Sequence, residues 1–113
     1  MDQISRSTEL MIGGVVYDKA FAVSGVCGMG VGLSAAAVAK SLHRDDKRMR
    51  GVRVKYDEER GYTVDVYIIA AFGANIPETA WNVQKSVSEG LRDDFGIEPE
   101  DINIHVQGVH AGA

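Results

Sequence analysis

The stretch TVDVYIIAAFGANIPETAWNVQKSVSEGL, residues 63–91, decides the fold because the spacing of its apolar residues changes half-way along. In its first half, successive residues alternate between two faces. One face carries the apolar Val64, Val66, Ile68 and Ala70, and the other carries Thr63, Asp65, Tyr67 and Ile69. A period of two is typical of a β-strand with one buried face. The pattern therefore predicts a strand, which ends at the break formed by Gly73 and Ala74.

The second half of the stretch has the start signals and the period of an α-helix. Asn75 can cap it, Pro77 falls in the first turn, and Glu78 completes a capping box with Asn75. Apolar residues then recur at spacings of three and four, in the order Ile76, Ala80, Val83, Val87 and Leu91. This stripe predicts a helix that runs to about Phe95 and ends at Gly96.

Two further strands flank this strand and helix. Residues 52–57 alternate in the same way and are joined to the strand by a turn at 58–61, while residues 102–108 form a last alternating segment. A right-handed crossover through the long helix makes the last strand parallel to the central one. We therefore expect an α+β fold with a small mixed three-stranded sheet and helices packed on one face.

The N-terminal half gives weaker signals. Residues 8–22 suit a helix capped by Ser7, although Gly13 and Gly14 each cost it about 1 kcal/mol relative to alanine. Residues 25–32 contain four glycines and are predicted to be a loop, and residues 33–42 a short alanine-rich helix. The expected order is α-α-β-β-α-β in a single domain over residues 1–113, with the Gly-rich and basic segment 25–51 as its mobile part.

Composition places the chain among ordinary soluble domains. Its 113 residues are 45% hydrophobic and 25% charged, with no apolar run long enough to cross a bilayer and Asp2 where a signal peptide would be basic. We therefore expect a cytoplasmic protein. Cys27 is the only cysteine and the three histidines show no ligand spacing, so neither a disulfide nor a metal site is predicted.

Charge is segregated along the chain. Residues 40–55 contain seven basic and two acidic residues, which gives this stretch a charge of about +5 in a chain whose net charge is −4. A basic patch on an acidic body could bind an anionic surface or a second copy, so Arg48 and Arg50 are candidate contact residues. The alternative is a solvated basic linker.

The face of the sheet away from the helices is the second candidate contact surface. Its strand parity gathers polar and aromatic side chains, namely Arg53, Lys55, Thr63, Asp65, Tyr67, Ile69, His105 and Gln107. Trp81 is a third candidate, because it lies about 140° around the long helix from Ile76 and is not needed for the main core. Alternatively, the first helix or the Gly-rich segment covers Trp81.

Enzymatic chemistry has weaker support. The Gly-rich loop lacks the spacing of a nucleotide-binding motif, and nothing near Cys27 in the sequence would lower its pKa. Asp65 and His105 share a face and could form an acid/base pair, but a plain surface ion pair or no contact is the stronger expectation. We therefore predict a protein that is not an enzyme.

Four runs of sequence carry a resemblance to a known family: VDVYII (64–69), GANIPE (73–78), WNVQKSV (81–87) and INIHVQGV (102–109). In this order they resemble the alkaline shock protein family, over roughly residues 51–109 and more weakly over 12–30. The resemblance implies a non-catalytic bacterial protein, typical of Gram-positive lineages, with a role in cell-envelope stress. It also implies no cofactor, and attachment to the membrane through a separate anchor protein.

These observations favour a protein that self-associates and binds partners near the membrane through the open sheet face, Trp81 and the basic stretch. Contacts with lipid-synthesis enzymes are a further possibility, because some relatives are associated with lipid metabolism. A small nucleic-acid-binding module is the rival hypothesis, motivated by the basic run and an aromatic residue on the open face, although the acidic whole opposes it.

Overall fold

The computed structural model describes residues 5–30 and 51–111. Within these residues the chain forms two helices and four strands in the order α1 (Arg6–Phe21), β1 (Val26–Met29), β2 (Val52–Asp57), β3 (Gly61–Ala71), α3 (Ile76–Phe95) and β4 (Asp101–His110). The helix expected at 33–42 lies outside the described residues.

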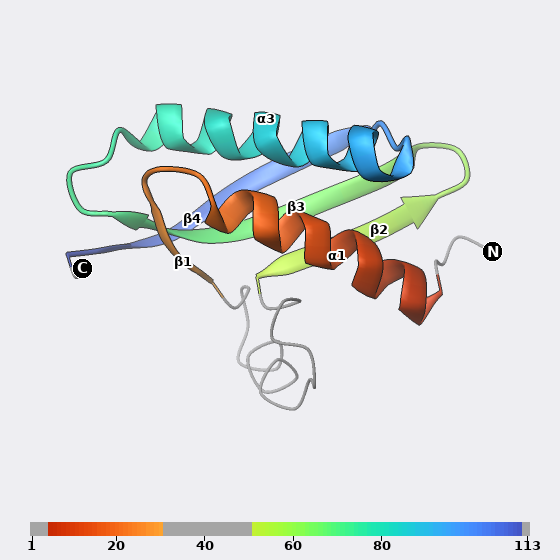
Figure 1. Ribbon diagram of the computed structural model, residues 1–113, viewed down its shortest axis with the longest axis horizontal. Coiled ribbons are helices and arrows are strands. Elements are labelled where there is room, and N and C mark those ends of the chain that lie inside the picture. Colours follow the sequence, from red (N-terminus) through yellow and green to blue (C-terminus); the bar gives the residue numbers. More distant parts are fainter. Residues whose placement is uncertain (1–4, 31–50, 112–113) are drawn as a thin grey trace.

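The sheet is mixed and both helices cover one of its faces (Figure 1). β3 pairs antiparallel with β1 and β2 and parallel with β4. The parallel last strand was predicted, and the α+β class is confirmed. The predicted number of strands was wrong, because the described sheet has four strands and not three.

The missing strand is β1, which lies in the segment predicted to be a loop. Its register pairs Val26 with Ala70 and Met29 with Ile68, with an irregularity before Gly28. Glycine has low strand propensity, so the local sequence favoured a loop. The pairing arises instead because β2 reaches only as far as Val66 along β3 and leaves the rest of that edge free.

β1 and β2 together occupy one edge of β3, since β4 takes the opposite edge over 63–71. The backbone of Tyr67 joins the two short strands: Gly30 N donates to Tyr67 O at 2.7 Å, and Tyr67 N donates to Gly51 O at 2.8 Å. Gly30 and Gly51 are therefore held at adjacent points on the same edge of β3.

The core lies between the helices and the sheet. Residues from every described element except β1 and β4 are buried in it, namely Ile12, Val16, Ala20, Val52, Val54, Val64, Val66, Ile68, Val83, Val87 and Leu91. The sheet residues among them are the even-numbered positions predicted to face inward, and the α3 residues belong to the predicted stripe. Burying these aliphatic side chains is the main source of stability, at roughly 1.5–3 kcal/mol for each of the larger ones.

Side-chain caps fix the helix starts. Asn75 Oδ1 accepts from Glu78 N at 3.0 Å, as predicted, and α3 ends at Gly96 in the left-handed conformation. α1 is capped by Ser5 and not by Ser7, with Ser5 Oγ accepting from Thr8 N at 3.2 Å. α1 passes through Gly13 and Gly14 without a break, because both are buried against its neighbours.

Candidate interaction surfaces

A hydrogen-bonded cluster occupies the sheet face opposite the helices, and we call its four residues Asp65, Tyr67, Asn103 and His105 the open-face cluster. The parallel register of β3 and β4 sets Asp65 beside Asn103 and Tyr67 beside His105. Asp65 Oδ1 accepts from Asn103 Nδ2 at 3.2 Å and lies 3.0 Å from His105 Nε2. Of the alternatives left open for Asp65 and His105 by the sequence, a contact between the two side chains is the one present.

The imidazole of His105 is held on two sides. A carboxylate only accepts hydrogen bonds, so the contact with Asp65 requires a proton on Nε2. The ring also stacks on Tyr67, with centroids 4.4 Å apart and planes 14° apart. Tyr67 is only 4% exposed, so the aromatic ring expected on the open surface is instead covered. The cluster orients its histidine by packing and hydrogen bonding together.

The other open-face candidates surround this cluster. Arg53 is exposed on β2 directly across from Asp65, and Lys55 is exposed across from Thr63. Gln107 is exposed on β4, and its side-chain amide lies against Gly30 so closely that a Cβ at Gly30 would collide with it. Strand parity therefore brought the predicted open-face residues to one side of the sheet.

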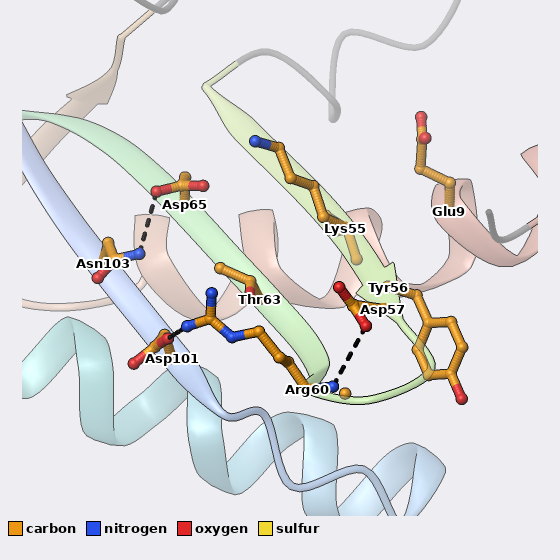
Figure 2. Close-up of a pocket in the computed structure, with 11 residues that line it drawn as sticks. Glu9, Lys55, Tyr56, Asp57, Arg60, Thr63, Asp65, Asp101 and Asn103 are labelled. Carbon is orange, nitrogen blue, oxygen red and sulfur yellow. Dashed lines mark hydrogen bonds and ion pairs between the residues drawn. The ribbon is translucent and has the colours of Figure 1, made fainter. Parts of the chain in front are cut away.

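A shallow polar depression of about 770 Å³ opens beside the cluster (Figure 2). Residues of α1, β2, β3, β4 and the turn between β2 and β3 line it, namely Glu9, Val54, Lys55, Tyr56, Asp57, Arg60, Gly61, Thr63, Asp65, Asp101 and Asn103. Arg60 Nη2 lies 3.5 Å from Asp101 Oδ2 within this depression. Acids and bases are mixed here, and among the described residues no three His, Cys, Asp or Glu side chains are grouped to hold a metal.

Trp81 belongs to α3, in the helix layer. It projects from α3 into solvent and is 58% exposed, with Lys85 Nζ 5.3 Å from its ring centroid. α1 packs on a different side of α3, where Ser86 Oγ donates to Lys19 O at 3.4 Å. The alternative in which the first helix covers Trp81 is therefore wrong.

Trp81 projects from α3, which covers one face of the sheet, and the open-face cluster lies on the other face, so one flat partner surface cannot touch both. The single surface that we expected from the sequence thus divides into two. Arg48 and Arg50 lie outside the described residues. Cys27 is exposed on β1, and its thiol donates to Ala70 O at 3.5 Å.

Two features of these surfaces were not singled out from the sequence. Asn103 is the second donor to Asp65, and its parity with His105 in β4 was the available signal. Exposed apolar side chains lie in the second half of β4 and just after β3, with Phe72 78%, Val109 54% and Val106 37% exposed. Alternation alone placed Val106 in the core, and its exposure follows from its position on the outermost described strand.

Comparison with known proteins gives the family. The model of the alkaline shock protein 23 family, described as having a cell envelope-related function, matches residues 3–111. The chain belongs to the alkaline shock protein 23 family. The resemblance noted in the sequence is thereby confirmed. As a member of this family, the chain has a cell-envelope-related function.

Two bacterial relatives match nearly the whole chain. The chain is 30% identical over 108 residues to the uncharacterized protein Spy1614 of Streptococcus pyogenes serotype M6, covering 96% of this chain and 88% of that one. It is 32% identical over 110 residues to the uncharacterized protein YloU of Bacillus subtilis, covering 95% and 88%. A shorter match, 35% over 60 residues, is to the uncharacterized protein YqhY of Bacillus subtilis, covering 53% and 44%. No solved structure matches the chain.

Proposed function

We propose that this member of the alkaline shock protein 23 family is a non-catalytic protein of the envelope stress response, which self-associates and binds a membrane-anchor protein at the cytoplasmic side of the membrane. The family's cell-envelope-related function supports the setting. Within the described residues no helix has the length and apolarity to cross a bilayer. In this proposal a separate anchor supplies the attachment.

The observation that carries the proposal is the exposure of Trp81. A tryptophan with 58% of its surface in solvent leaves a large apolar ring in water, in a helix whose buried stripe is already complete without it. Tryptophan is among the residue types most enriched where binding energy is concentrated at protein interfaces. The ammonium group of Lys85 lies over the ring and could also form an ion pair with a carboxylate of a partner.

The open-face cluster supports a binding role over a catalytic one. Asp65 accepts from both Asn103 and His105, and His105 is stacked on a buried tyrosine. The contact through Nε2 leaves the second ring nitrogen of His105 able to act as a base, but a general base also needs a nucleophile or substrate within reach, and the contacts described for this imidazole are with Asp65 and Tyr67. The cluster ties β3 to β4 across the polar face of the sheet.

The rival hypothesis of nucleic-acid binding has less support. Binding of single strands relies on exposed aromatic rings on which bases stack, and Tyr67 is only 4% exposed. The open face also carries carboxylates near Lys55, which would repel phosphates. A regulatory contact with lipid-synthesis enzymes is compatible with the same surfaces, so the experiment must distinguish it from anchoring.

The test is photo-crosslinking in the native cell with a photoreactive amino acid at position 81. A matched control carries the same residue at Met11, which is 61% exposed on α1. We expect position 81 to capture a small membrane protein and position 11 to capture much less of it. Capture of lipid-synthesis enzymes at position 81 would establish the soluble regulator instead, and equal capture at both positions would contradict a role for Trp81.

A further inference from the structure

β4 is a long edge strand with little protection against pairing. Within the described residues it pairs with β3 and with no other strand, so its outer edge offers free backbone groups to a further strand. Natural edge strands are usually protected by lysine, proline or inward-pointing charges. Residues 102–109 contain no Lys, Arg, Asp, Glu or Pro. One side chain does reach the strand, since Gln84 Nε2 donates to Ile102 O at 2.9 Å, but this contact is exposed and a partner strand could replace it.

The side chains of β4 show which part of the edge is suited to pairing. Ile102 and Ile104 are half-buried on the helix side, and Val106 beside them is 37% exposed. The register with β3 then breaks, because Ile68 pairs with Val106 while Ile69 pairs with Gly108, which leaves Gln107 as a bulge. A bulge twists an edge away from a neighbour, so the regular segment available for pairing ends near Gln107.

We propose that the outer edge of β4 pairs antiparallel with β4 of a second copy, centred on Ile104. This inference rests on the self-association in the proposed function and names its surface. In this register Val106 lies opposite Ile102 of the second copy, and the two Ile104 side chains meet on the two-fold axis. The exposed surface of Val106 is thereby covered, and two four-stranded sheets become one continuous sheet.

The open-face side of the same register is also self-complementary. Asn103 lies opposite His105 of the second copy, so an amide faces an imidazole and no two like charges are opposed. This matters for a chain of net charge −4, because two copies repel each other at long range. A second β4 also matches the length of the edge and satisfies its backbone groups, as in other strand additions.

The first test is the oligomeric state of the full chain by sedimentation equilibrium. We expect the wild type to dimerise and Val106→Lys to weaken dimerisation by roughly tenfold or more, because a lysine would be held against the partner's Ile102. Val109→Lys is the matched control. It adds the same charge to a more exposed position of the same strand, beyond the bulge, and should leave dimerisation nearly unchanged.

The second test is independent of any loss of binding. In a Cys27→Ala background, Asn103→Cys places two thiols on diagonal neighbours across the proposed pair, roughly 7–8 Å apart. A short bis-maleimide should join them efficiently, and should not join the Trp81→Cys variant in the same background. Circular dichroism melting of each variant confirms that it is folded.

The outcomes separate the two proposals. A dimeric wild type whose Val106→Lys variant dimerises equally well, or whose Asn103→Cys variant does not crosslink, overturns the β4 contact while self-association stands. A wild type that is monomeric at high concentration overturns self-association and the β4 contact together. Pairing through β4 is supported if Val106→Lys loses the dimer, Val109→Lys keeps it and the Asn103→Cys variant crosslinks.

Discussion

His105 Nε2 lies 3.0 Å from Asp65 Oδ1, on two strands that run parallel although 40 positions separate the residues in sequence. The pair exists because the crossover through α3 returns the chain beside β3 in a register that sets Asn103 next to Asp65. Asp65 thus joins the two longest described strands through two side-chain hydrogen bonds. It is a structural contact on the sheet face that the helices leave open.

Replacing Asp65 should therefore destabilise the fold without removing any buried apolar area. We expect Asp65→Ala to lower the free energy of unfolding by about 1–3 kcal/mol, because Asn103 and His105 both lose their acceptor. Asp65→Asn keeps an acceptor oxygen and should lose less. Urea denaturation measures both values. An unchanged free energy of unfolding in Asp65→Ala would show that the hydrogen bonds contribute nothing.

The aliphatic core gives a second prediction. Ile68 has no exposed surface, whereas Phe72, four residues further along the chain, is 78% exposed. Ile68→Ala should lower the free energy of unfolding by about 2–5 kcal/mol, since it leaves a cavity between the sheet and the helices. Phe72→Ala is the control and should change it by less than about 0.5 kcal/mol. Similar losses in the two variants would contradict the placement of the core.

The elements that were predicted correctly are those whose sequence alone contains the information. Asn75, Pro77 and Glu78 mark the start of α3, Gly96 marks its end, and the stripe between them faces the sheet. β3 alternates so regularly that its buried face could be listed. In these segments local propensity and tertiary packing favour the same structure.

The features that were missed depend on tertiary conditions. β1 forms because part of the β3 edge is left free, which the local glycine content cannot indicate. Ser5 and Ser7 are equally good caps, so the choice between them depends on where α1 meets the core. In the open-face cluster, the alternation along the strands correctly placed Asp65 and His105 on one face of the sheet. It could not show that Tyr67 is buried or that β4 lies at the edge of the described sheet.

Gly51 provides a prediction about the edge of β3, where its carbonyl accepts from Tyr67 N. It has φ +78°, and a Cβ there would lie 2.6 Å from Gly30 O and 2.9 Å from Tyr67 O. Gly51→Ala should therefore cost at least about 2–3 kcal/mol, the left-handed strain plus a collision with backbone atoms that cannot move aside. Thermal or urea unfolding measures the loss.

The control for Gly51 is Gly73, which has φ +86° but would have no heavy atom within 4 Å of an added Cβ. Gly73→Ala should cost only the conformational strain, about 1–2 kcal/mol. The difference between the two variants isolates the crowding around the Tyr67 backbone. If the two losses were equal, the close approach of Gly30 and Gly51 would have no energetic weight.

The cap of α3 gives the last prediction, because this helix carries Trp81 and packs on the sheet. Asn75 Oδ1 accepts from Glu78 N at 3.0 Å and satisfies one of the amides exposed at the helix start. Asn75→Ala should lower the free energy of unfolding by about 1 kcal/mol, and Asn75→Ser should restore most of it. Asn82→Ala, in the interior of the same helix, is the control for the loss of an asparagine that caps nothing. Trp81 follows the first turn of α3, so an ordered helix start should hold it in place for its partner. Asn75→Ala should then also reduce photo-crosslinking from position 81. Asn82→Ala should leave this crosslinking unchanged.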